Sequence, residues 1–363
     1  MKTFFASSTV LLISSLAIPA VTQSVPKAVD GYSVGIFARS VPGKYTQPDS
    51  IAVLGKHIFI GYGDGNDPAG LDGKSNQIVE YNMNGSVAFI YEVVGHNDGL
   101  KVNPYTHKLW AMQNEDGNPN LVVIDPANGE ERIYTPAAPP PHGGGYDDII
   151  FRDGKAYFSA SNPAHNPNTE PALVEVKLQG DTFEVSSALE GNAKAKDVVT
   201  GAIVTLNLQD PDSTTVTPAH DILLDSQGDS ELVLIHNAGL PKQSVLVIPL
   251  SSPFGIPQAD DTIFTTSDDG FILAADTPAN IVYKIHKNGF VPGTGYTAAV
   301  GAPDQSGASV GFVGELDLSF GDLSPVVTGF QSPHGMAFVN TDTDDNTGGG
   351  TCSDAPQSTV NLN

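Results

Sequence analysis

The sequence predicts an all-β protein, a β-propeller, for which six four-stranded blades fit best and seven are the alternative. Two observations predict this fold. The apolar runs are short and are separated by Gly, Pro, Asn and Asp, as is typical of strands and turns. Groups of such runs also recur at a spacing of roughly 40–50 residues, as the blades of propellers do. Because one such sheet cannot bury both of its faces, neighbouring repeats are expected to stack radially.

The first repeat shows the pattern most clearly. Its four strand-like runs lie at 51–54, 57–60, 77–81 and 87–91. The last two are joined through Asn84-Gly85, which is a strong signal for a tight hairpin turn. Asn84-Gly85-Ser86 is also a sequon for N-glycosylation if the host is eukaryotic, but the turn is the simpler interpretation.

Similar runs follow along the chain. They lie at 100–102, 108–112, 121–124 and 132–134, then at 149–151, 156–159, 173–176 and 182–185, then at 222–224, 232–235 and 245–248, and then at 262–264, 271–274 and 281–284. A further first strand is expected at 336–339. Residues 187–215 look like an insertion, and the runs at 312–318 and 325–328 lack an inner strand. We expect 32–37 to close the ring beside C-terminal strands.

The two ends of the sequence have different characters. Residues 1–22 resemble a secretory signal peptide, with Lys2 before an apolar run, and an uncleaved anchor is the alternative. Residues 25–340 are predicted to form a single propeller domain, and 341–363 a disordered tail rich in Gly, Thr and Asp. Cys352 is the only cysteine, which excludes an intramolecular disulfide. The protein is therefore expected to be secreted and extracellular.

The net charge is −24 at pH 7. A surface this acidic repels phosphate backbones, so nucleic acid is not an expected partner. It suits calcium or cationic ligands, and it equally suits a solvated surface in an acidic or salty medium. We expect a monomer that binds a small molecule or another extracellular ligand and has no membrane partner.

The entries to the first strands share one chemical feature. In a four-stranded blade, the loop before the first strand and the loop joining the second and third strands open on the same face. In each of the six predicted first strands, the residue two positions before the first apolar residue is Asp or His. These residues are Asp49, Asp98, Asp147, His220, Asp261 and His334. Asp often caps turns, which is the structural interpretation, but His does not. A shared pocket at the mouth of the central channel is the functional interpretation.

The second set of loops adds polar groups to the same face. Calcium takes six to eight oxygen ligands in flexible geometry, which suits a mouth rich in Asp and Asn. The candidate ligands are Asp98, Asp147, Asn114, Glu115, Asn162, Asn237 and Asp276. The expected substrate-binding residues around them are Asp49, His96, Tyr146, His236 and Asp261. The alternatives are zinc, held by His220, His236 and His334, and a mouth without metal.

Several motifs resemble a known group of propellers. Ser332-Pro333-His334-Gly335-Met336-Ala337-Phe338 and residues 47–53 resemble the first-strand motif of NHL-repeat and SMP-30/gluconolactonase-like propellers, and 271–283 resembles their second and third strands. The resemblance covers roughly 45–340. That superfamily includes calcium-dependent lactonases and esterases, strictosidine-synthase-like proteins and non-enzymatic binding propellers. In its lactonases Glu, Asn and Asp hold calcium, and the counterparts implied here are Asn114 or Glu115, Asn162, Asn237 and Asp276.

Three functions fit these features. The first is a hydrolase of lactones or related esters, in which calcium polarises the carbonyl and His220 or His334 is the general base. The second is a non-catalytic propeller that binds an extracellular glycan, peptide or protein, with a structural metal or none. The third is a biosynthetic enzyme that only orients its substrate. The third would need an apolar mouth, whereas this mouth is predicted to be polar.

Overall fold

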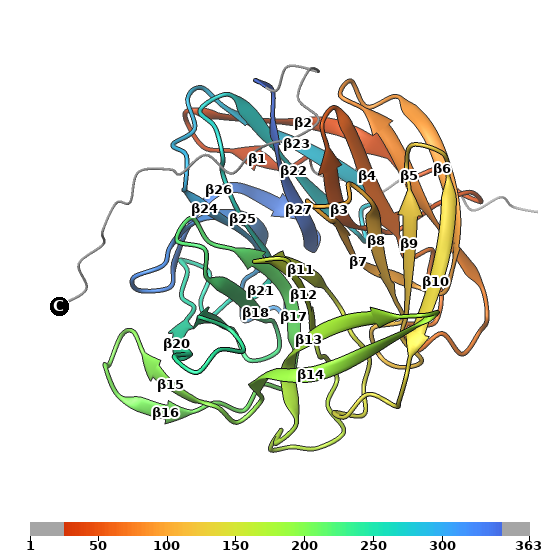
Figure 1. The fold of residues 1–363 in the computed structure, drawn as a ribbon. Coiled ribbons are helices and arrows are strands. Elements are labelled where there is room, and N and C mark those ends of the chain that lie inside the picture. The colour runs from red at the N-terminus through yellow and green to blue at the C-terminus, as the bar shows by residue number, and fades with distance from the viewer. Residues whose placement is uncertain (1–24, 343–363) are drawn as a thin grey trace, which may run out of the picture.

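The computed structural model describes residues 25–342. The predicted signal peptide, Cys352 and nearly all of the predicted tail lie outside this range. Within it the regular structure is entirely β-strand, which confirms the all-β propeller prediction (Figure 1). No helix in this part of the chain is long and apolar enough to cross a membrane.

The first three four-stranded groups follow the chain as simple meanders. The first is β3 (Pro48–Leu54), β4 (His57–Tyr62), β5 (Ser75–Asn82) and β6 (Val87–Val94). The second is β7 (Asn97–Val102), β8 (Leu109–Gln113), β9 (Asn120–Asp125) and β10 (Glu130–Pro136), and the third is β11 (Ile149–Arg152), β12 (Lys155–Ser159), β13 (Pro171–Gln179) and β14 (Thr182–Glu190). A short parallel pairing between β10 and β14 joins the second group to the third.

The fourth group differs from the prediction. Its inner strand is β17 (Pro211–Val216), and it continues with β18 (Ile222–Ser226), β19 (Glu231–His236) and β20 (Ser244–Pro249). The apolar run at 222–224 is therefore the second strand of this group. A hairpin of β15 (Lys194–Asp197) and β16 (Ile203–Thr205) extends the sheet beside β20. The stretch predicted as an insertion thus includes this hairpin and most of the inner strand.

The last two groups exchange segments, so the predicted fifth repeat is wrong. β21 (Gln258–Phe264) pairs with β24 (Gly295–Val300), followed by β25 (Gly311–Asp317), β26 (Asp322–Phe330) and β1 (Lys27–Ala28). β22 (Gly270–Asp276) and β23 (Ile281–Lys287) instead lie between β27 (Pro333–Asn340) and β2 (Tyr32–Arg39). β21 is thus the inner strand of the sheet that contains the strand-like runs at 312–318 and 325–328. The predicted closing strand at 32–37 lies in the same sheet as β27.

The inner strands surround the central axis. β3, β7, β11, β17, β21 and β27 contact one another in this order, and β27 contacts β3 again, so the described strands close a ring (Figure 1). The core lies between adjacent sheets. In one such cluster Ile58 and Ile60 of β4 pack with Phe271 and Leu273 of β22. This stacking buries the sheet faces and leaves the inner strand entries together at one end of the axis.

Candidate functional site

Acidic side chains converge where the inner strands begin, at the end of the axis called the mouth below. The strand entries carry Asp49, Asp98, Asp147, Asp212, Asp260 and His334. Three of them, Asp98, Asp147 and Asp212, each offer a carboxylate oxygen, and these oxygens lie within 4.8 Å of one another. Asp147 is buried and the other two are half-buried. Three oxygens this close could hold one metal ion.

Local backbone irregularities and two glycines place these side chains. The pairing register shifts at the entries of β3, β7, β17, β21 and β27, as in β-bulges, which redirect side chains near functional sites. A Cβ on Gly99 would lie 2.1 Å from the carbonyl oxygen of Asp147. One on Gly335 would lie 2.6 Å from that of Asp49. Neighbouring inner strands can therefore approach closely only because glycine follows Asp98 and His334.

Burial and mutual repulsion raise the pKa values of the carboxyl groups at the mouth. For Asp98 the causes are burial and then the charge of Asp49, and for Asp212 they are burial and then the charge of Asp260. The pKa of Asp147 is also well above its usual range, mainly through burial, while a 2.5 Å hydrogen bond from Ser161 Oγ opposes the shift. A bound divalent cation would relieve this repulsion, and carboxylate oxygens are the ligands that calcium prefers. The residues present therefore fit a calcium ion.

His334 lies between two carboxylates of the mouth. Its Nδ1 is 3.2 Å from Asp260 Oδ1 and 3.6 Å from Asp49 Oδ2. Burial alone would lower the pKa of His334, but Asp260, Asp49 and Asp276 outweigh burial and raise it above its ordinary value. Gln227 Nε2 donates a 2.8 Å hydrogen bond to Asp260 Oδ1. Since Nδ1 faces these carboxylates, Nε2 is the nitrogen left to exchange a proton with a ligand.

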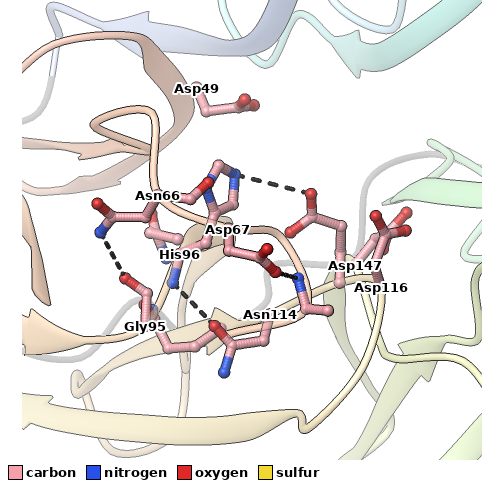
Figure 2. Close-up of polar contacts among 12 residues, drawn as sticks. Asp49, Asn66, Asp67, Gly95, His96, Asn114, Asp116 and Asp147 are labelled. Carbon is pink, nitrogen blue, oxygen red and sulfur yellow. Dashed lines mark hydrogen bonds and ion pairs between the residues drawn. The ribbon is translucent and has the colours of Figure 1, made fainter. Parts of the chain in front are cut away.

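His96 and Glu115 form a second pair at the mouth. His96 Nε2 lies 3.6 Å from Glu115 Oε1, while Glu115 Oε2 is buried without a partner among the described residues. Burial first, and the charge of Asp49 among others, raise the pKa of Glu115 to about 8. Figure 2 shows how the loop around His96 is fixed: Asn114 Oδ1 accepts the His96 amide at 2.9 Å, and Asn66 Nδ2 donates to the Gly95 carbonyl at 3.1 Å.

Three predicted site residues lie at the opposite end of the axis. His220 is exposed in the turn between β17 and β18, far along β17 from Asp212. His236 and Asn237 end β19 on that same side, and His236 Nδ1 instead pairs with Asp221 Oδ2 at 2.6 Å. The prediction was wrong here because it took β18, the second strand of this sheet, for the inner strand. Neighbouring strands run in opposite directions, so residues that precede β18 or follow β19 lie at the far end and not at the mouth.

Other predicted residues lie near the mouth but are engaged elsewhere. Asn114 and Asp276 bond to backbone groups, the latter accepting the amides of Gln331 and Ser332. Asn162 is exposed and donates to Asp116 Oδ1. Tyr146 packs in an aromatic cluster with His142, Phe158 and Phe183. Asp261 accepts the Met336 amide at 2.6 Å. The three histidines of the zinc alternative are not brought together: His334 lies at the mouth, whereas His220 and His236 lie at the far end.

Sequence reasoning missed Asp212 and Asp260. Pro211-Asp212 repeats the pattern of Pro48-Asp49 and Pro333-His334, and that dipeptide was the available signal. It was hidden because β17 consists largely of Asp, Ser and Thr and does not look like a buried strand. Asp260 directly precedes Asp261. The register shift between Ala259 and Asp261 places Asp260, and not Asp261, beside His334 at the mouth.

The far end of the channel has a different character. A hollow of about 300 Å³ lies there, and its lining includes Ile51, Val53, Lys101, Phe151, Met336 and Phe338. Lys101 Nζ lies 3.1 Å from the buried carboxylate oxygen Asp148 Oδ2. The same oxygen accepts the amide of Thr214 at 2.8 Å. The hollow thus holds one ammonium group among apolar side chains and the two threonines Thr214 and Thr215.

Among known proteins, similarity to this chain was found in solved structures. No protein-family model matches the chain, and no curated protein matches its sequence. A Bacteroides caccae protein of unknown function is similar in structure at 10% identity and a TM-score of 0.46, over 80% of this chain and 86% of that one. A virginiamycin B lyase from Staphylococcus aureus is similar at 12% identity and 0.44, over 72% and 100%. A suggested gluconolactonase is similar at 10% identity and 0.42, over 84% and 96%. The likeness to these structures is one of fold.

Proposed function

We propose that this protein is a secreted propeller that binds calcium at the channel mouth and hydrolyses a lactone or related ester there. The observation that carries the proposal is the convergence of the Asp98, Asp147 and Asp212 carboxylates within 4.8 Å. These three residues would hold the ion, and the charge of Glu115 acts on Asp98 and Asp147 of this group. When bound, calcium would act as a Lewis acid toward the carbonyl of the substrate.

The residues of the chain itself supply the proton chemistry. His334, with Nδ1 toward Asp260 and Asp49, is the general base that takes a proton from water through Nε2. The flanking carboxylates increase the basicity of its imidazole and stabilise the imidazolium that forms. His96, beside Glu115, is the second imidazole near this charge cluster and orients the substrate or the departing alcohol. The acidic mouth repels anions and therefore favours a neutral substrate.

The test uses the purified whole protein. Metal analysis should find calcium, and a panel of neutral lactones and esters should include a substrate whose hydrolysis stops with a calcium-specific chelator and returns with added calcium. A chelator that lowers the melting temperature without any hydrolysis to lose would favour the non-catalytic binding propeller instead. Absence of calcium binding would remove both the metal site and the proposed chemistry.

A further inference from the structure

The strand at the outer edge of the first blade is unusually exposed. Figure 1 shows β6 at the rim of the ring, and no described strand pairs with its outer side. Four of its large apolar side chains are open to solvent: Val87 is 44% exposed, Phe89 53%, Ile90 40% and Val94 51%. Glu92 is its only charged residue. A long, apolar, unpaired edge of this kind is a template for association with another chain.

The other outer edges are better covered. Four outer strands, β10, β14, β20 and β26, pair along part of their length with a further strand. β2 and the short β16 have open edges like β6, but each carries a single exposed large apolar side chain, Ile36 and Ile203 respectively. The polypeptide therefore leaves the most apolar edge without protection of its own.

The turn that leads into β6 contains the only Asn-X-Ser/Thr sequon of the chain, Asn84-Gly85-Ser86. Asn84 is exposed, and its Oδ1 accepts the Ser86 amide at 3.0 Å and the Ser86 hydroxyl at 2.7 Å. Its Nδ2 makes no hydrogen bond within residues 25–342. Gly85 has a φ of 80°, and a Cβ there would lie 2.3 Å from the Phe37 carbonyl oxygen, so the turn is tightly specified. The side-chain amide nitrogen therefore points out of a rigid turn with nothing to occupy it.

We propose that Asn84 is N-glycosylated during secretion and that the glycan shields the β6 edge from association. The donor would be an oligosaccharide linked to a lipid pyrophosphate. Asn84 Nδ2 forms the bond to the anomeric carbon, the bond from that carbon to the pyrophosphate oxygen breaks, and Nδ2 loses one proton. A bulky, solvated group at the start of β6 lies beside the exposed Val87 and Phe89 and blocks approach to that edge. The proposal depends on secretion and is independent of the mouth chemistry.

The experiment is secretion of the full chain from a yeast host. Intact mass should show one oligosaccharide that peptide:N-glycosidase removes. N84Q and S86A should lack it, and the matched variant S86T, which keeps the sequon, should retain it. A native protein without the added mass would overturn the proposal.

The shielding role has its own measurement. Size-exclusion chromatography at rising concentration should show larger species after enzymatic removal of the glycan and in N84Q. The double variant N84Q/F89K, which places a charge on the edge, should elute at one position, that of a monomer, at every concentration. Monomeric elution of the deglycosylated protein at every concentration would overturn the shielding role. Circular dichroism of each variant separates association from failure to fold.

Discussion

The two ends of the central channel are built from the same six inner strands but differ in chemistry. At the mouth, the strand entries present five aspartates and one histidine, and their charges act on one another. At the far end, the same strands present apolar side chains and two threonines around Lys101, which pairs with Asp148 and is also acted on by the charges of Asp261 and Asp225. The difference teaches that the carboxylates of the mouth have no lysine or arginine partner of their own within the described residues, whereas a buried lysine faces the carboxylates nearer the far end. The predictions below test this contrast.

The largest effect on stability is expected from loss of the buried ion pair between Lys101 and Asp148. K101M should lower the free energy of unfolding by about 3 kcal/mol, because it leaves the Asp148 carboxylate buried without its counter-charge. The matched control is K108M, which removes a more exposed partner of Asp125 and should cost no more than about 1 kcal/mol. Urea unfolding of both variants measures the difference. Equal losses would show that the channel pair is no more important than a surface pair.

The next effect concerns catalysis at the mouth. H334A should lower kcat/KM for the calcium-dependent substrate by about a hundredfold, since it removes the proposed general base. H220A, in the exposed turn of the far end, should leave kcat/KM unchanged. Steady-state kinetics on both variants checks this. A comparable loss of kcat/KM in H220A would contradict the assignment of the general base to His334.

A smaller effect concerns the metal. D212N should weaken calcium binding by at least about tenfold, or about 1.4 kcal/mol, because the amide replaces one of three convergent charges. N237A, at the far end, should bind calcium as the native protein does. Isothermal titration of calcium into chelator-treated protein gives both constants. If D212N binds normally, the trio is not the metal site.

The smallest effect is a pH dependence of stability without calcium. The pKa is about 8 for Glu115 and about 7 for Asp260, whereas such groups ionise near pH 4 in an unfolded chain. Between these values the folded protein binds more protons, so its stability falls as pH rises from about 4 to 8. We expect Tm to fall by a few degrees from pH 5 to 8, since solvent at the mouth screens these charges. Added calcium should remove the difference. A Tm that rises over this interval would contradict the assignment.

The sequence was most informative where strands are apolar and consecutive in the fold. The meander of the first repeat, with its Asn84-Gly85 turn, was predicted almost strand for strand. It was misleading where an inner strand is polar, because β17 faces the channel and needs few apolar residues. It also could not show the exchange of strands between the last two blades. Apolar periodicity predicts that a strand exists, whereas its partner depends on contacts distant in sequence.

The site was predicted in part for the same reason. Asp98, Asp147 and His334 were correctly placed at strand entries, because turn chemistry and the first apolar residue define an entry locally. Asp212 was missed and His220 wrongly included because one strand was counted in the wrong order. Hydrogen-bonding roles such as that of Asn114 were beyond prediction, since an amide that bonds backbone and one that holds a metal look alike in sequence.

The crossed order of the last two blades also has a consequence for how the chain folds. β22 must wait for β27, and β21 for β24, while β23 pairs with β2 from the opposite end of the described chain. Neither blade can form as soon as its first strands leave the ribosome: the sheet of β21 is complete only after β26, and the sheet of β22 only after β27. Long-range pairing of this kind is slow. The last strand made, β27, thus closes the ring, and a chain that stops before it would leave the sheet of β2, β23 and β22 without its inner strand.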